Sequence, residues 1–128
     1  MTTIRSRVRH SKETERRVQR ALWPGSRRPW KDRWDVSGLD SNGGQWLGEV
    51  KEARGLSLSE GMRLLREAVN QLQTAVTEEE AAEAAGLFVV IHQVSSPTDW
   101  VWVVAGDTTW GPYTLEEFRK RWLLREER

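Results

Sequence analysis

The chain of 128 residues contains no cysteine, which excludes disulfide bonds and thiolate metal sites. Metal ligands can therefore come only from carboxylates, the two histidines and main-chain carbonyls, a set that suits a hard cation. The sequence also lacks an apolar run near the roughly 20 residues that span a bilayer, and no apolar stretch follows the N-terminal arginines as in a secretory signal. We therefore expect a cytoplasmic protein with no membrane partner.

A chain of this length suits one domain, and we assign residues 1–10 to a basic N-terminal arm and residues 11–128 to a single domain. The net charge of +1 hides a strong asymmetry, because residues 1–34 carry eleven Lys and Arg against three Asp and Glu. Neutralising phosphates releases counterions, so such a surface suits nucleic acid. The alternative is a solvated helix face or a disordered basic arm.

Helical and strand patterns alternate along the chain and predict an α/β protein with a mixed sheet and helices on both of its faces. Capping boxes begin three of the helices, and Asn42-Gly43-Gly44 is a strong hairpin turn. The long helix that follows the hairpin requires a parallel crossover. We expect helices at 11–22, 57–76, 77–85 and from Thr114 onward, and strands at 33–37, 45–52, 87–94 and 100–105.

The hairpin brings two acidic residues together. Alternation places Glu49 and Lys51 on one face of the second strand. If the turn is symmetric about Asn42, Asp35 lies opposite Glu49 with the Cβ atoms about 5 Å apart. Carboxylates this close repel unless a cation or a proton intervenes, so we expect a bound Mg²⁺ with Lys51 beside it. The alternative is a surface ion pair between Glu49 and Lys51, with Asp35 exposed.

The segment Trp34-Asp35-Val36, the glycine-rich turn and Gly48-Glu49-Val50-Lys51 resemble the signature of the PD-(D/E)XK nucleases, with Trp34 in the place of the proline. The layout of residues 11–94 is similar to that of phage and archaeal-type Holliday junction resolvases. This resemblance implies a restriction-endonuclease-like fold and a prokaryotic or phage source. It also implies that the helix acid is Glu15 and that Gln71 is the glutamine of a later helix. The implied catalytic residues are Glu15, Asp35, Glu49, Lys51 and Gln71, and the implied metal ligands are Asp35, Glu49 and the main chain of Val50.

The implied function is Mg²⁺-dependent cleavage of branched or double-stranded DNA by a homodimer, with Mn²⁺ as a possible substitute. The alternatives are a general nicking or repair nuclease, or a catalytically silent DNA-binding module of the same fold. The candidate dimer interface is the strand from Trp100 with the final helix. The candidate DNA-binding residues are Lys12, Arg16, Arg27, Arg28, Lys31 and Arg33.

Two residue types need a separate interpretation. Eight tryptophans could stack on bases, but tryptophan is more often found in a core or an interface, and Trp30 is the best candidate exception. His92 lies within a strand pattern and is expected to be a hydrogen-bonded core histidine rather than a metal ligand.

Overall fold

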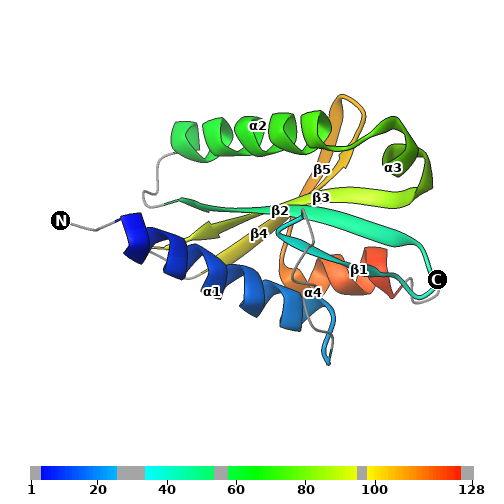
Figure 1. Ribbon diagram of the computed structural model, residues 1–128, viewed down its shortest axis with the longest axis horizontal. Helices are drawn as coiled ribbons and strands as arrows, with labels where there is room; N and C mark the ends of the chain where they lie inside the picture. Colours follow the sequence, from blue (N-terminus) through cyan, green and yellow to red (C-terminus); the bar gives the residue numbers. More distant parts are fainter. Residues whose placement is uncertain (1–3, 26–33, 54–57, 95–97, 125–128) are drawn as a thin grey trace.

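The computed structural model describes residues 4–25, 34–53, 58–94 and 98–124, with the backbone alone for 4–11 and 58–60. Its centre is one five-stranded sheet with the strand order β1-β2-β3-β4-β5 (Figure 1). β2 and β3 are parallel, and the other neighbours are antiparallel, so the predicted mixed sheet is confirmed. The strands are β1 (Val36–Leu39), β2 (Gln45–Ala53), β3 (Ala84–Gln93), β4 (Thr98–Ala105) and β5 (Thr108–Tyr113).

Helices cover both faces of this sheet, as the sequence predicted. α2 lies on one face, and α1 and α4 lie on the other (Figure 1). The capping boxes predicted at Thr77 and Thr114 both form, each with the reciprocal bond from the main chain to the glutamate. The helices are α1 (Ile4–Leu22), α2 (Leu58–Ala75), α3 (Glu78–Glu83) and α4 (Leu115–Phe118), which continues as a π-helical turn, η1 (Arg119–Leu123).

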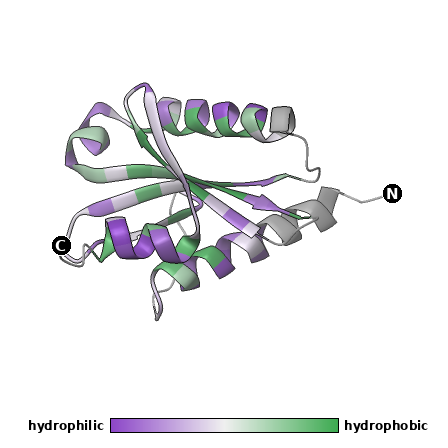
Figure 2. Ribbon diagram, turned by 180° about the vertical axis from the view of Figure 1, so that it is seen from behind, coloured by the Kyte–Doolittle hydropathy of each residue, from purple (hydrophilic) through white to green (hydrophobic). Residues whose placement is uncertain are grey.

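Two apolar clusters hold these layers together, one on each face of the sheet. The α2 face joins Leu47, Ala53, Val89 and Ile91 of the sheet to Leu64, Leu65, Ala68 and Leu72 of α2. The α1 face joins Trp46, Val50, Phe88 and Val90 to Val18, Leu22, Phe118 and Leu123. Because side chains alternate along β2, Glu49 and Lys51 belong to the α2 face, between Leu47 and Ala53. Figure 2 shows hydrophobic and hydrophilic stretches alternating along α2, as expected for a helix with one buried face.

The β1–β2 turn sets the register that the sequence predicted. Asp40 is buried, and its Oδ1 accepts hydrogen bonds from the main-chain N–H groups of Asn42 and Gly44, both at 2.9 Å. Its Oδ2 accepts from Trp46 Nε1 at 3.0 Å. Gly43 supplies the positive φ of 82° that the turn requires. The resulting pairs, from Val36 with Gly48 to Leu39 with Gln45, are those of a hairpin symmetric about Asn42.

Several predicted element boundaries are wrong, and one strand was not predicted. The strand expected at 33–37 runs from Val36 to Leu39, because the hairpin pairing continues up to the turn. The strands expected at 87–94 and 100–105 begin earlier, at Ala84 and Thr98. α1 begins at Ile4 and not at Ser11, so the segment assigned to a basic arm is largely helical; arginine favours helix well enough to extend it. The short helix predicted to reach Ala85 ends at Glu83, where β3 takes over. The strand β5 was not predicted, because Gly111-Pro112 is typical of a turn; β5 is an edge strand with a register shift opposite these residues, a position that tolerates proline.

Ser57 and the turn at residues 95–97 lie outside the described residues. No described helix is long and apolar enough to cross a membrane.

Candidate active site

Asp35 and Glu49 lie side by side where β1 begins. The pairing of Val36 with Gly48, continued by one residue, places Asp35 opposite Glu49. Asp35 Oδ2 accepts a hydrogen bond of 2.9 Å from the Val50 N–H. If β1 were longer, a main-chain carbonyl of β1 would accept this bond instead. This bond fixes the Asp35 carboxylate against β2. The predicted juxtaposition of the two acids is therefore present in the structure.

The Glu49 carboxyl group is strongly perturbed by these surroundings. Burial first, then the charge of Asp35 and a hydrogen bond to Asp35, raise the pKa of Glu49 from 4.5 to about 8. The positive charge of Lys51 acts in the opposite direction, and the negative charge of Glu15 raises the pKa further. Near neutral pH Glu49 therefore holds a proton, and its carboxyl O–H donates a hydrogen bond to Asp35. A cation that binds between them would displace this proton.

The donor set suits a hard divalent cation that completes its shell with water and phosphate. Among the residues that the structure describes, no three His, Asp and Glu side chains are grouped to hold a metal ion. Two carboxylates are sufficient for Mg²⁺, which keeps several waters and binds substrate phosphate. The carbonyl of a strand residue points toward the same neighbour as its N–H, so the Val50 carbonyl is directed toward Asp35. Asp35, Glu49 and the Val50 main chain fit the group that the resemblance implies.

The two helical residues expected in the site are placed differently. Glu15 is buried on α1, with 8% of its surface exposed, and it lies close enough to Glu49 to affect its pKa. Gln71 lies on α2 and is exposed. Within the described part of the chain, no hydrogen bond links Gln71 to Asp35, Glu49 or Lys51. The structure thus brings Asp35 and Glu49 together, with Lys51 and Glu15 near enough to Glu49 for their charges to affect its pKa, and the role of Gln71 stays a prediction.

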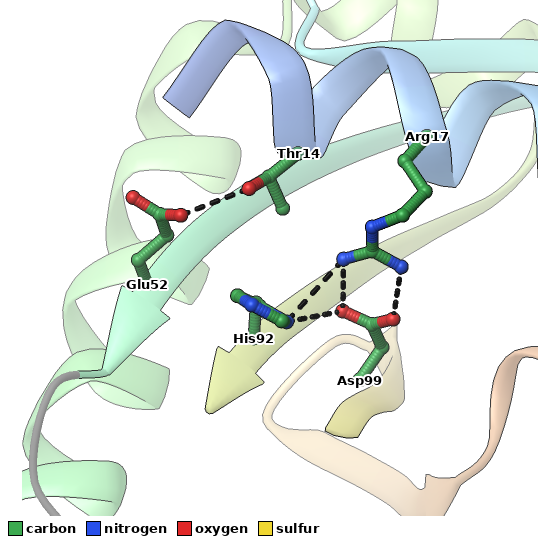
Figure 3. A network of polar contacts seen from close by, with 5 residues as sticks. All are labelled: Thr14, Arg17, Glu52, His92 and Asp99. Carbon is green, nitrogen blue, oxygen red and sulfur yellow. Dashed lines mark hydrogen bonds and ion pairs between the residues drawn. The ribbon is translucent and has the colours of Figure 1, made fainter. Parts of the chain in front are cut away.

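A polar network that the sequence did not predict attaches α1 to the sheet (Figure 3). Arg17 forms a two-pronged ion pair with Asp99 at the start of β4, with Nη2 2.9 Å from Oδ1. His92 Nδ1 lies 2.8 Å from the same Asp99 oxygen. Burial alone would raise the pKa of Asp99, but the hydrogen bond and charge of Arg17, followed by those of His92, hold it below its ordinary value. His92 is thus a hydrogen-bonded histidine, as predicted.

A second contact in this network is the hydrogen bond of 2.8 Å from the Thr14 hydroxyl to Glu52 Oε2. Glu52 is the neighbour of Lys51 on β2 but belongs to the α1 face. The amphipathic pattern of α1 could have indicated which face is buried. It could not indicate which strand each polar residue meets.

The candidate DNA-binding residues are described only in part. Lys12 and Arg16 are exposed on α1, one helical turn apart. The other four candidates and Trp30 lie outside the described residues: Arg27, Arg28, Lys31, Arg33 and Trp30.

Most of the described tryptophans pack against the core, as predicted. Trp34 and Trp46 are buried, and Trp23, Trp102 and Trp122 pack against the two clusters. Trp110 is exposed on the edge strand β5, with 52% of its surface accessible, and Trp100 on β4 is half-buried. β4, which carries Trp100, pairs with a strand on each side, so its main chain is not open to a partner strand.

No protein-family model, curated protein sequence or solved structure matches this chain. The functional argument therefore depends on the residues of the site.

Proposed function

We propose that this protein is a Mg²⁺-dependent DNA endonuclease with a restriction-endonuclease-like fold and that its substrate is a four-way DNA junction. The observation that carries the proposal is the contact between the carboxyl groups of Asp35 and Glu49, with Lys51 on the same face of β2. A purely structural surface would not place two acids in contact, because like charges destabilise the fold. Perturbed carboxyl groups beside a lysine are typical of functional sites.

Each residue has a distinct role in this proposal. Asp35, Glu49 and the main chain of Val50 hold the ion, for which Mn²⁺ is an expected substitute. Bound Mg²⁺ supplies an activated water and offsets charge on the phosphate. Lys51 donates hydrogen bonds to a phosphate oxygen as its charge increases. Lys12 and Arg16 contact phosphates beside the scissile one, together with the basic residues 27–33.

The resemblance to junction resolvases suggests the substrate and the homodimer. Resolution needs two matched cuts on opposing strands, which a twofold dimer provides. The predicted interface combined the strand from Trp100 with the final helix. Because β4 lies inside the sheet, we place the contact at β5, where Trp110 is exposed. Sedimentation equilibrium tests this: a monomer at the concentrations used for cleavage would exclude the dimer.

The test of the function compares labelled four-way junction with linear duplex of the same sequence, in EDTA and in Mg²⁺. Asp35→Asn and Lys51→Ala should retain DNA binding and lose cleavage by about a hundredfold or more. Glu52→Gln is the matched control, because Glu52 lies on the same strand but faces away from the site and bonds to Thr14. Glutamine can still accept that bond, so this variant should cleave as the wild type does.

The outcomes separate the candidate functions. Metal-dependent cutting of the junction alone, lost in both site variants and kept in Glu52→Gln, supports the resolvase. Equal cutting of junction and duplex supports a general nicking or repair nuclease. Binding without cleavage by every form, with and without Mg²⁺, contradicts the enzyme and supports the silent DNA-binding module.

A further inference from the structure

The outer edge of β1 is covered by side chains of α1. Gln19 is buried, with 3% of its surface exposed, and its Nε2 donates to the Ser37 carbonyl at 2.8 Å. Its Oε1 accepts from the Ser37 N–H at 3.1 Å. One amide thus satisfies both main-chain groups of an edge residue, as a sixth strand would. If the Gln19 amide were flipped, its NH₂ group would face the Ser37 N–H and its oxygen would face the Ser37 carbonyl. The observed orientation is therefore the only one that forms both hydrogen bonds.

Trp23 repeats the contact one turn further along the helix. Its Nε1 donates to the Leu39 carbonyl at 2.8 Å. The ring lies directly over Gly38, where an added Cβ would be 2.2 Å from Trp23 Cε2. Gly38 therefore permits the close approach of α1 to the edge.

These contacts follow a common step along the helix and the strand. Four helical residues advance about 6 Å, and two strand residues advance about 6.6 Å. The pairs Trp23 with Leu39 and Gln19 with Ser37 therefore predict a third pair one step earlier, Glu15 with Asp35. Asp35 shares the strand parity of Ser37 and Leu39, so α1 runs parallel to the edge and reaches the site at Glu15.

We propose that Gln19 is a positioning residue, which fixes α1 along β1 so that the buried Glu15 carboxylate lies at the border of the site formed by Asp35 and Glu49. This inference rests on the proposed function. The burial of Glu15 and its effect on the pKa of Glu49 agree with the position that the two observed pairs predict. The three polar groups of α1 that face β1 therefore have two tasks: Gln19 and Trp23 align the helix, and Glu15 contributes to the chemistry.

The test is a double-mutant cycle on cleavage with Gln19→Met and Glu15→Gln. Methionine keeps the length of the side chain and removes both hydrogen bonds. If Gln19 acts through Glu15, Gln19→Met should lower kcat about 10-fold to 100-fold in the wild type, as expected for a displacement near 1 Å. In the Glu15→Gln background, Gln19→Met should lower kcat less than about twofold, because the carboxylate that Gln19 positions is already absent.

Thr14→Val is the matched control, since it removes a hydrogen bond from the same helix to β2 rather than to the β1 edge. It should lower the urea midpoint about as much as Gln19→Met and leave kcat within about twofold. An equal loss of kcat in Thr14→Val, or the same loss from Gln19→Met in both Glu15 backgrounds, would overturn the proposal. If Gln19→Met does not fold, Trp23→Phe replaces it in the cycle, with the same criterion.

A wild-type protein that cleaves no DNA would end the proposed function without deciding this inference. Calorimetric titration of the same proteins with Mn²⁺ then decides it. The positioning role is supported if Gln19→Met weakens Mn²⁺ binding in the protein with Glu15 and does not weaken it in the Glu15→Gln background. An equal effect in both backgrounds, or no Mn²⁺ binding at all, overturns it.

Discussion

The proton held between Glu49 and Asp35 predicts how the stability of the protein depends on pH. Glu49 has its pKa raised from 4.5 to about 8. Between these values the folded protein binds more protons than the unfolded chain, so the free energy of unfolding falls as pH rises. Glu49→Gln has the same shape and no titrating proton, so this part of the pH dependence should disappear. In EDTA the variant should match the wild type near pH 4.5 and exceed it in stability at pH 8.5.

The size of the effect follows from the same pKa. Moving the pKa of Glu49 from 4.5 to about 8 corresponds to at most about 5 kcal/mol, at about 1.36 kcal/mol per pKa unit. Glu49 is only half-buried, so solvent screens its interaction with Asp35, and we expect about 2 kcal/mol. Urea denaturation of both proteins at pH 4.5, 6.5 and 8.5 measures this difference.

Mg²⁺ should reverse the order of stability of the two proteins, so that the wild type becomes more stable than Glu49→Gln. A cation at a hundred times its dissociation constant stabilises the folded wild type by about 2.7 kcal/mol. Glu49→Gln lacks one charged ligand and should gain much less. Glu52→Gln again serves as the control on the opposite face of β2, and it should follow the wild type in both series. A stability difference between Glu49→Gln and wild type that stays constant from pH 4.5 to pH 8.5 would refute the shared proton.

Three further predictions concern the surroundings of the site. Gly38→Ala should lower the free energy of unfolding by about 1–3 kcal/mol, because the new methyl group displaces the Trp23 ring; an unchanged urea midpoint would contradict the close contact. Lys12→Gln and Arg16→Gln should each reduce the slope of log K against log salt by about 0.9 in DNA-binding titrations, whereas an unchanged slope would place them off the DNA. Asp99→Asn should cost about 1–3 kcal/mol at pH 7. Because the pKa of Asp99 is lowered, the difference should shrink as pH falls below about 4, and urea titrations that show no such convergence would contradict the ion pair.

The hairpin shows what the sequence could predict about the site. Asn42-Gly43-Gly44 gave the turn, and the alternation along β2 gave the face of Glu49 and Lys51, because turn chemistry and strand period are local properties. The symmetric register followed from these two features alone. The part played by Asp40 was missed, since its three hydrogen bonds are visible only once the turn and Trp46 are in place.

The position of α1 shows what the sequence could not predict. The apolar stripe through Val18 and Leu22 indicated the buried side of the helix, and both residues are buried. A stripe gives no information about which strand lies beneath it or about the direction of the helix across the sheet. Gln19 therefore had no distinguishing feature: a polar residue beside an apolar stripe is usually solvated, and its partner Ser37 lies 18 positions away.

The same physical requirement accounts for both the fold of this region and its chemistry. An edge strand must have its outer main-chain groups satisfied, and here α1 does so through Gln19 and Trp23. β1 begins at Val36, one residue after Asp35, which leaves the Val50 N–H to the Asp35 side chain. A longer β1 would pair with β2 through its main chain and would release the Asp35 carboxylate from Val50. The late start of β1 therefore leaves the Val50 N–H free to hold the Asp35 carboxylate beside Glu49.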